Sequence, residues 1–496
     1  MWESILLSSL SALLLVLALD VPFLRIGINL ADEGYLYFGS RQVLKGKVPI
    51  IDFRSYDPGR YYWCALWLGI FGESLWIQRL SMSFLKWITL AIIGFLCLEV
   101  SDSWLIVVAI QISCLGWLFI YYKMVECLFI ATQLLSFWMV LQYGNDLAFA
   151  SVAFLLSFSL ILGINMTVYH GGAVVLFFVL SRISMLTVPL NPVVFGLLVG
   201  ALPLFIIIVR YPHFIKHYWA RKISPMLKRK STNLKLPYPW VWRNPSHITQ
   251  STRARTFTAK LLFTLIPIFF ILVGFSFRFG AFESSANAPL IIPALVVGIP
   301  WLNHIISRAD IGHLHIIGLP LSLLLLNTSS IHFTGAIILA ICIAWMTLST
   351  WFFRPSFTTK YFQPVLKKLR FENRRFWMTR NQKVVIAEIV NLVGMRGDKT
   401  TFFAPNLCML YALTNTQPAA YDTFPVYPAT DSKQAEMIHE LSTSLPTLVV
   451  INNFQLDQNA DRCFSATHPK VWDYLQNEFQ TVQTEKLPST YFVFSK

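Results

Sequence analysis

The stretch ADEGYLYFGSRQVLKGKVPIIDFRSYDPGRYYW, from Ala31 to Trp63, follows an apolar run at 4–20. It opens with two adjacent carboxylates, Asp32 and Glu33, and it adds further acids, arginines and tyrosines in a chain otherwise rich in Leu, Ile, Phe and Val. So much charge directly after a membrane helix requires a reason. Chemistry at the membrane surface is the leading one.

Composition places the chain among polytopic membrane proteins. Of its 496 residues, 55% are apolar and only 13% are charged, whereas a soluble domain has about 25% charged residues. The net charge of +15 is concentrated between the apolar segments, above all at 210–260. Residues 1–20 have no basic start, and Asp20 replaces a small-residue cleavage site, which favours an uncleaved first helix over a signal peptide.

Apolar segments predict eleven membrane crossings, because a hydrocarbon core of about 30 Å needs about 20 apolar residues. They lie at about 4–20, 82–100, 103–121, 125–143, 148–165, 170–188, 192–210, 260–277, 289–305, 312–328 and 332–351. A twelfth candidate, Tyr61 to Trp76, is shorter, contains two glycines and Glu73, and is rich in Tyr and Trp. These aromatic residues prefer the headgroup level, so this segment is predicted to be an interfacial helix.

The number of crossings fixes which loops share a membrane face. With eleven crossings, the loops at 21–80 and 210–260, the turn at 306–312 and the tail after 352 lie on one side. With twelve, the first loop would be separated from the other three. We adopt the single reactive face because it is the simpler arrangement.

The tail differs in composition and predicts a small α/β domain. Its start is basic and aromatic, as expected of a strip against lipid headgroups. Strand-like KTTFFA, PTLVVIN and STYFVFS then alternate with helical patterns near 431–444 and 468–480. No glycine-rich phosphate loop precedes these strands. We therefore expect a transmembrane catalytic domain at 1–351 and a soluble domain at 352–496.

The seven cysteines do not suggest structural zinc, because they form no CxxC pattern and no His/Cys cluster. Most of them lie in apolar runs and are expected to be small hydrophobic residues. Cys408 and Cys463 lie in the tail and could form a disulfide, although spacing alone does not support one.

Asp32 and Glu33 are the catalytic candidates. A carboxylate beside the membrane can accept a proton from an acceptor hydroxyl and make it a better nucleophile, or it can help hold a divalent cation. The spacing of the sequence fixes no third metal ligand, so we favour a site without a metal ion over one that binds a divalent cation. The alternatives are a solvated loop acid or an N-cap of the amphipathic segment that follows. Capping and catalysis are compatible.

The first loop also supplies candidates for substrate binding. Guanidinium groups match phosphate oxygens, and Arg60, in the turn YDPGRYYW, is the strongest candidate. For Lys45 and Lys47 we favour simple extension toward lipid headgroups. Further candidates in the same stretch are Tyr35, Asp57 and Tyr61.

Three short turns are predicted on the same face. YYKMVE contributes Lys123 and Glu126; INMTVYHGG contributes Tyr169 and His170; SRADIGHLH contributes Arg308, Asp310, His313 and His315. A lone histidine near a membrane helix is usually structural. The last cluster is less ordinary and could bind phosphate through Arg308 and an imidazole. Metal binding by His313 and His315 is disfavoured because their spacing puts them on different helix faces.

The sequence resembles bacterial membrane glycosyltransferases of the GT-C class, closest to the protein mannosyltransferase-like family and its relatives that transfer aminoarabinose or other sugars onto lipids. The resemblance rests on the DE pair after the first membrane helix, the segment GKVPIIDF with Asp52 and Phe53, the turn DPGRYYW, and SRADIGHLHIIGLPL with its R-x-D-x-x-H spacing. It covers the whole chain loosely, and its motifs are specific for the class but not for the sugar.

The resemblance implies a GT-C fold with a C-terminal extracytoplasmic domain and a polyprenyl-phosphate sugar donor used on the outer membrane face. By analogy, Asp32 is the general base, and Arg308 and His313 contact the donor phosphate. Many relatives carry a lysine motif where this chain has INMTVYHGG, so His170 could replace that lysine. The acceptor is a lipid, glycan or protein, membrane lipids surround the chain, and no nucleic acid is expected.

Two other functions remain open at this stage. A transporter or lipid-linked flippase usually carries ionisable residues at mid-bilayer and repeated halves, whereas Lys86 is the clearest charge in these apolar runs and no repeat is visible. A receptor-like protein with a ligand-binding tail would leave the first loop unexplained. The predicted sidedness follows the resemblance, because the positive-inside rule alone favours the reverse orientation.

Overall fold

A computed structural model describes residues 2–181, 187–229, 234–248, 253–279, 288–329, 341, 344, 348, 366–371, 374–397 and 399–496. The chain forms two units, one of Met1–Phe23 with Leu80–Pro355 and one of Leu24–Arg79 with Ser356–Lys496. This division differs from the predicted domains, 1–351 and 352–496, because the first loop, Leu24–Arg79, groups with the tail.

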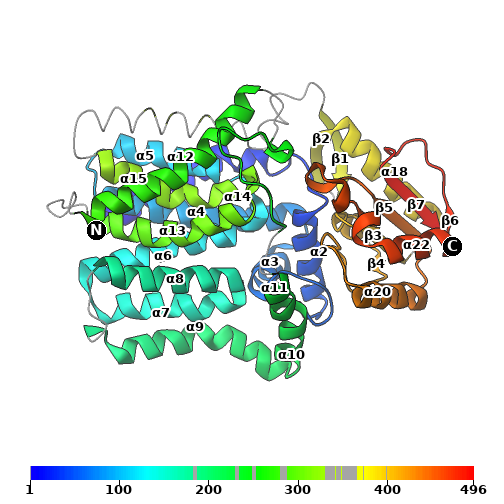
Figure 1. Cartoon of the computed structure of the whole chain (residues 1–496), viewed down its shortest axis with the longest axis horizontal. Helices are drawn as coiled ribbons and strands as arrows, with labels where there is room; N and C mark the ends of the chain where they lie inside the picture. Colours follow the sequence, from blue (N-terminus) through cyan, green and yellow to red (C-terminus); the bar gives the residue numbers. More distant parts are fainter. Residues whose placement is uncertain are drawn as a thin grey trace. The chain divides into compact units, whose positions relative to one another are not determined.

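The first unit is a bundle of apolar helices (Figure 1). They are α1 (Trp2–Leu19), α4 (Leu75–Leu98, which begins in the second unit), α5 (Trp104–Trp117), α6 (Met124–Tyr143), α7 (Asp146–Leu162), α8 (Ile164–Ser181), α9 (Leu190–Arg210), α12 (Arg253–Arg278), α13 (Ala288–Ser307), α14 (Ile311–Leu314) and α15 (Gly318–Ser329). The polar loop after α9 carries α10 (Phe214–Tyr218), a π-helical turn (Trp219–Ile223), α11 (Ser224–Arg229) and a 3₁₀ turn (Ser246–Ile248). Further 3₁₀ turns are Val21–Phe23, Tyr121–Lys123 and His315–Ile317.

The chain is an integral membrane protein. Seven helices of the described chain are long and apolar enough to cross a membrane, and three others, at Trp104–Trp117, Asp146–Leu162 and Ile311–Asn327, are apolar but shorter. Together they match ten of the predicted crossings. The eleventh, at 332–351, falls almost entirely outside the described residues, so the total of eleven stays a prediction.

Packing distinguishes central from peripheral helices in this bundle. Helices α6 and α13 are mostly buried, whereas α9 exposes leucines, valines and phenylalanines along its length, as a lipid-facing helix does. Helix α9 approaches α7 through glycines: a Cβ on Gly196 would lie 2.2 Å from the carbonyl oxygen of Ala150. Small residues allow this close approach of membrane helices.

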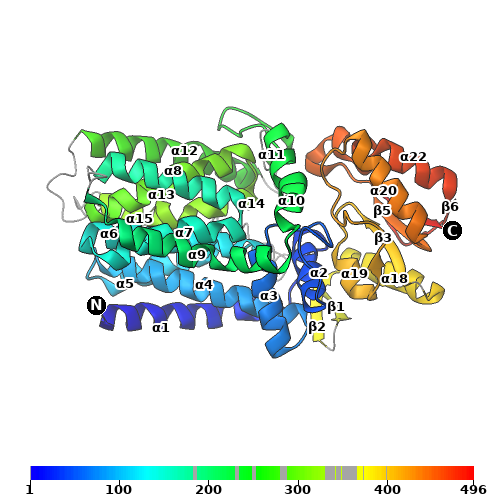
Figure 2. The ribbon, with the colours of Figure 1, turned by 90° about the horizontal axis from the view of Figure 1, so that it is seen from below.

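Polar side chains join the end of α1 to α4 inside the bundle; both helices are labelled in Figure 2. Lys86 Nζ lies 2.7 Å from Asp20 Oδ1, and both side chains are fully buried. Ser83 donates to the other oxygen of Asp20 at 2.6 Å, and the ammonium group lies 4.1 Å from the ring centre of Tyr121. Lys86, the charge noted in an apolar run, therefore has an opposite charge beside it, as a buried ion requires.

The second unit contains a five-stranded sheet of order β4-β3-β5-β7-β6. Its strands are β3 (Thr400–Ala404), β4 (Gln417–Pro418), β5 (Leu448–Asn452), β6 (Gln480–Thr481) and β7 (Tyr491–Ser495). A hairpin, β1 (Leu366–Phe371) and β2 (Arg374–Thr379), precedes it. The helices are α2 (Asp32–Leu44), α3 (Pro58–Phe71), α18 (Arg380–Arg396), α19 (Met409–Thr414), α20 (Asp431–Ser444), α21 (Phe464–Thr467) and α22 (Pro469–Glu478), with 3₁₀ turns at Leu456–Gln458 and Ala460–Arg462.

Both faces of the sheet are covered by helices, because successive strand residues point to opposite sides. On one face, Phe402 and Val449 pack with residues of α20, α21 and α22. On the other, Phe403 and Val450 pack with residues of α18 and α19, and with Phe38 of α2. The three strands and two helices predicted in the tail are confirmed, and α2 from the first loop completes the second face.

The first loop packs with the tail through its backbone. Met409 N donates to the carbonyl of Leu30 at 3.0 Å. Trp377 N donates to the carbonyl of Arg25, and Gly27 N donates to the carbonyl of Trp377, both at 2.7 Å. Helix α2 lies so close to α19 that a Cβ on Gly34 would be 2.4 Å from Met409 N. These contacts join segments more than three hundred positions apart, which local sequence patterns do not reveal.

The structure corrects one local prediction, the turn at Tyr169 and His170, and closes two alternatives that the sequence had left open. Asp32 and Glu33 do not cap α2, because Ala31 is the N-cap and no side chain caps that end. Tyr169 and His170 lie inside α8 and not in a turn. Cys408 and Cys463 are free thiols and form no disulfide.

The predicted interfacial helix and the basic strip are also revised. The helix is α3, which ends at Phe71, and Trp76 belongs to α4. The strip at the start of the tail forms the β1–β2 hairpin from Leu366, where Phe376 and Met378 are buried. Its first part, with Arg354 and Lys360, lies outside the described residues.

Replacing Gly34 with Ala should destabilise the second unit. The added methyl group would overlap the Met409 backbone, and overpacking of this kind costs about 1–3 kcal/mol. Gly394→Ala in α18, where a Cβ meets nothing within 4 Å, is the matched control and should be neutral or stabilising by up to about 1 kcal/mol. Thermal unfolding of the full chain in detergent measures both, and equal midpoints would contradict the proposed α2–α19 contact.

Candidate functional site

Asp32 is the first residue of α2 and is half-buried. Its Oδ1 accepts a hydrogen bond of 2.7 Å from the hydroxyl of Tyr56. Tyr56 is itself fixed, because its backbone N donates to Tyr61 at 3.0 Å and its ring lies 5.0 Å from the guanidinium carbon of Arg60. Among the described residues Oδ2 has no hydrogen-bond partner. Asp32 is therefore a held carboxylate with one oxygen left to accept a proton.

Glu33 is engaged differently from its neighbour. Arg79 Nε and Nη2 donate to its two carboxylate oxygens at 2.6 and 2.7 Å, and both side chains are buried. The same guanidinium also donates to the carbonyls of Leu24, Ile26 and Gly27. A bidentate pair with this many bonds supports a structural role for Glu33, and its predicted catalytic role remains without support from the geometry.

The other first-loop candidates surround Asp32 in the same unit. Tyr35 is buried and stacks on Phe424 at 4.8 Å. Burial, with the neighbouring Tyr61, raises the pKa of Tyr35 well above its ordinary value, so the phenol stays neutral. Burial likewise raises the pKa of Tyr61. Asp57, at the N-cap position of α3, and Arg60 are both buried.

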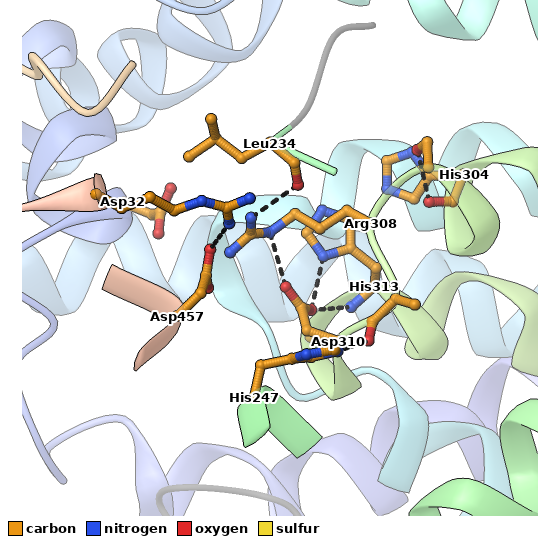
Figure 3. Close-up of polar contacts among 12 residues, drawn as sticks. Asp32, Leu234, His247, His304, Arg308, Asp310, His313 and Asp457 are labelled. Atoms are coloured by element: carbon orange, nitrogen blue, oxygen red, sulfur yellow. Dashed lines mark hydrogen bonds and ion pairs between the residues drawn. The ribbon is translucent and has the colours of Figure 1, made fainter. Parts of the chain in front are cut away.

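A second polar cluster lies between α13 and α15, in the first unit (Figure 3). Asp310 accepts from Arg308 Nε at 2.8 Å and from His313 Nδ1 at 2.7 Å, and it caps α14 through the His313 backbone. Arg308 also donates to the carbonyl of Leu234 at 3.1 Å. Burial alone would raise the pKa of Asp310, but His313, Arg308 and Lys123 outweigh it and hold that pKa well below its usual range. The carboxylate therefore keeps the cations in place.

His304 belongs to this cluster and was not predicted as a site residue. It is buried in α13, and its ring lies 4.9 Å from that of His313. Neither of its ring nitrogens has a hydrogen-bond partner among the described residues, and the same holds for Nε2 of His315. A buried polar atom without a partner costs about 1–3 kcal/mol. A polar ligand at this place would remove that cost.

The candidates from the two remaining turns are engaged in different ways. Glu126 is buried in the first turn of α6, and Lys123 directly precedes that helix. His170 is fully buried, with Nδ1 2.6 Å from Gln133 and Nε2 2.9 Å from the carbonyl of Val152. Both of its nitrogens are therefore used inside the bundle. This geometry gives no support to the prediction that His170 replaces a phosphate-binding lysine.

No group of three or more His, Cys, Asp or Glu side chains in the described part of the chain is placed to hold a metal ion. A dependence on a divalent cation therefore stays untested.

The chain resembles a solved structure over almost its whole length. That structure is of ArnT from Cupriavidus metallidurans, bound to undecaprenyl phosphate; the TM-score is 0.55, the identity 12%, and the match covers 97% of each chain. The chain has the ArnT fold. The predicted GT-C fold is thereby confirmed. No family model and no curated protein matches the sequence.

Glu33→Gln should act on stability. Removing one partner of a buried ion pair leaves the other charge uncompensated and costs about 3 kcal/mol, so the unfolding midpoint of the purified chain should fall clearly. Asp431→Asn is the control, because 79% of its side chain and 55% of that of its partner Lys470 are exposed, and exposed pairs contribute at most about 1 kcal/mol. A stable Glu33→Gln protein with lost activity would instead indicate a catalytic glutamate.

Proposed function

We propose that this protein is an integral membrane glycosyltransferase that moves a sugar from a polyprenyl-phosphate donor to an acceptor hydroxyl. The observation that carries the proposal is Asp32, a carboxylate fixed by Tyr56 whose second oxygen has no hydrogen bond within the part of the chain that the structure describes. The fold adds support, because ArnT was solved with undecaprenyl phosphate. We also propose that the reaction takes place on the extracytoplasmic face.

Asp32 acts as the general base in this proposal. The acceptor O–H gives its proton to Asp32 as its oxygen attacks the anomeric carbon. The bond from that carbon to the phosphate oxygen breaks, and its electron pair leaves with the phosphate. Attack opposite the leaving group inverts the anomeric configuration, and a single nucleophilic event needs one carboxylate where a hydrolase uses two.

The cations of Arg308 and Lys123 serve the leaving group, with the imidazole of His313 beside them. A phosphate leaves already charged, so it needs cations more than a proton, and fixed cations stabilise the charge that develops. Asp310 orients Arg308 and His313. The N–H of the His304 ring, whose nitrogens have no partner among the described residues, donates a further hydrogen bond to a phosphate oxygen.

Replacing Asp32 with Asn should abolish transfer without unfolding the protein. Loss of a general base lowers turnover by at least about 100-fold, and the isosteric amide still accepts from Tyr56. The assay follows a radiolabelled polyprenyl-phosphate sugar into acceptor in membranes and in nanodiscs. Glu73→Gln, another carboxylate of the first loop with a 45% exposed side chain, should retain activity. Near-normal turnover of Asp32→Asn would refute the base assignment, and donor translocation without transfer would favour a flippase.

The donor-phosphate assignment is tested by binding. Arg308→Ala should weaken binding of undecaprenyl phosphate by about 10- to 100-fold, because a hydrogen bond to a charged group contributes about 1.5–3 kcal/mol. Arg278→Ala, an exposed arginine at the end of α12, is the control and should bind normally. Affinities are measured in detergent by native mass spectrometry.

A second variant separates ligand binding from folding. His304→Phe keeps an aromatic ring and removes two buried nitrogens that lack partners, so the ligand-free protein should be as stable as the wild type or more stable. Its affinity for undecaprenyl phosphate should fall. A destabilised protein with unchanged affinity would show that His304 is structural.

A further inference from the structure

The carboxyl ends of β3 and β5 lie side by side in the second unit. The two strands are parallel neighbours, with Ala404 opposite Ile451. Ligands in open α/β sheets bind outside the carboxyl ends of such strands. Two asparagines stand at this edge, Asn406 shortly after β3 and Asn452 at the end of β5. Neither residue was a sequence-based candidate.

Polar atoms at this edge lack partners. Asn406 Oδ1, Asn452 Oδ1 and Thr423 Oγ1 are buried and have no hydrogen-bond partner among the described residues. Thr423 is completely buried, and its carbonyl accepts from the thiol of Cys408 at 2.8 Å. Buried acceptors of this kind are satisfied by a ligand that donates hydrogen bonds, as hydroxyl groups do.

A half-exposed ion pair from the first loop stands beside them. Arg54 pairs with Asp422, next to Thr423, with 24% and 25% of the side chains exposed. Arg54 Nη1 also donates to the carbonyl of Phe424 at 3.0 Å, and its guanidinium carbon lies 5.5 Å from the ring centre of Tyr427. The Arg54–Asp422 pair is therefore held in place by Phe424 and Tyr427, and part of each side chain is exposed to solvent.

The edge is continuous with the neighbourhood of Asp32. Tyr35, Cys408 and Phe424 form one buried cluster, against which Ala31 and Tyr56 pack. Asp422 and Asp32 both act on Cys408, whose pKa is raised by burial first and by these two charges next. The charges of Asp422 and Arg54 also act on His468, at the start of α22. One polar region thus runs from Asp32 to the ends of β3 and β5.

Its charges indicate a neutral ligand. The carboxylate of Asp422 is balanced by its partner Arg54, and Asp32 adds a second carboxylate to the same region. A site for phosphate or another anion needs excess positive charge, which this edge does not offer. Carboxylate, guanidinium, amide and aromatic groups together suit a molecule with several hydroxyl groups.

We propose that this edge, formed by Arg54, Asn406, Asp422, Thr423 and Asn452, binds a neutral carbohydrate acceptor and presents its hydroxyl to Asp32. The inference rests on the proposed function for the role of Asp32. Asp422 and Arg54 are positioning residues that select the acceptor, since a site built to bond hydroxyl groups discriminates strongly against analogues that lack them.

Binding is tested on the full chain in detergent by saturation-transfer NMR. The probes are the methyl glycosides of mannose, glucose, galactose, arabinose and N-acetylglucosamine, with mannose 6-phosphate as an anionic probe. At least one neutral glycoside should receive saturation, and its signal should fall at least fivefold in Asp422→Asn and in Asn406→Ala. Asn406→Ala removes an oxygen that has no partner, so it should fold normally. Glu388→Gln, elsewhere in the same unit, should bind as the wild type.

The outcomes separate this inference from the proposed function. Asp32→Asn should still bind the glycoside while transfer is lost. A wild-type chain that binds a glycoside but transfers no sugar would refute the proposed function alone. Once transfer is measured, Asp422→Asn should raise the acceptor KM at least tenfold and leave kcat within about twofold. Binding of the anionic probe alone, binding of no neutral glycoside, or an unchanged KM in Asp422→Asn would each overturn the carbohydrate site.

Discussion

The ion pair of Arg79 and Glu33 fixes the local geometry on which the second unit depends. The guanidinium of Arg79, near the start of α4, donates hydrogen bonds to three carbonyls of the segment that leads into α2. It also donates to both carboxylate oxygens of Glu33, the second residue of α2. Both side chains are buried, and a buried charge is tolerated only when its hydrogen bonds are complete. The start of α2, and with it Asp32, therefore has one position.

This constraint explains why two neighbouring carboxylates differ so much. Glu33 points into the unit and is saturated with bonds, whereas Asp32 keeps one oxygen free and is held by a phenol. Sequence alone left both as catalytic candidates. Adjacent helical residues point in different directions, but only the docking of the helix decides which of the two faces the interior. The docking depends on Gly34 and Met409, which are far apart in the chain.

The sequence predicted the membrane helices from the length of the apolar runs and the tail strands from their strand-like segments. Ten described helices follow the predicted apolar runs, since a membrane span needs only length and hydrophobicity. The central strands of the tail are buried on both faces, with alternate residues against the two helix layers. His170 and His304 show where prediction stops. Both lie in apolar helices. His170, which was a sequence-based candidate, has hydrogen bonds at both ring nitrogens. His304, which was not a candidate, has two nitrogens without a partner among the described residues. Only the neighbours of a side chain in space distinguish these cases.

The grouping of Leu24–Arg79 with Ser356–Lys496 has a consequence for biosynthesis. A chain leaves the ribosome from its N-terminus, and domains fold as their residues become available. The segment with Asp32 is made early, but the surface against which α2 packs is made late. The proposed base thus takes its final position only after most of the bundle has been inserted. A stalled or truncated product lacks this position, so incomplete chains in the membrane carry no competent carboxylate.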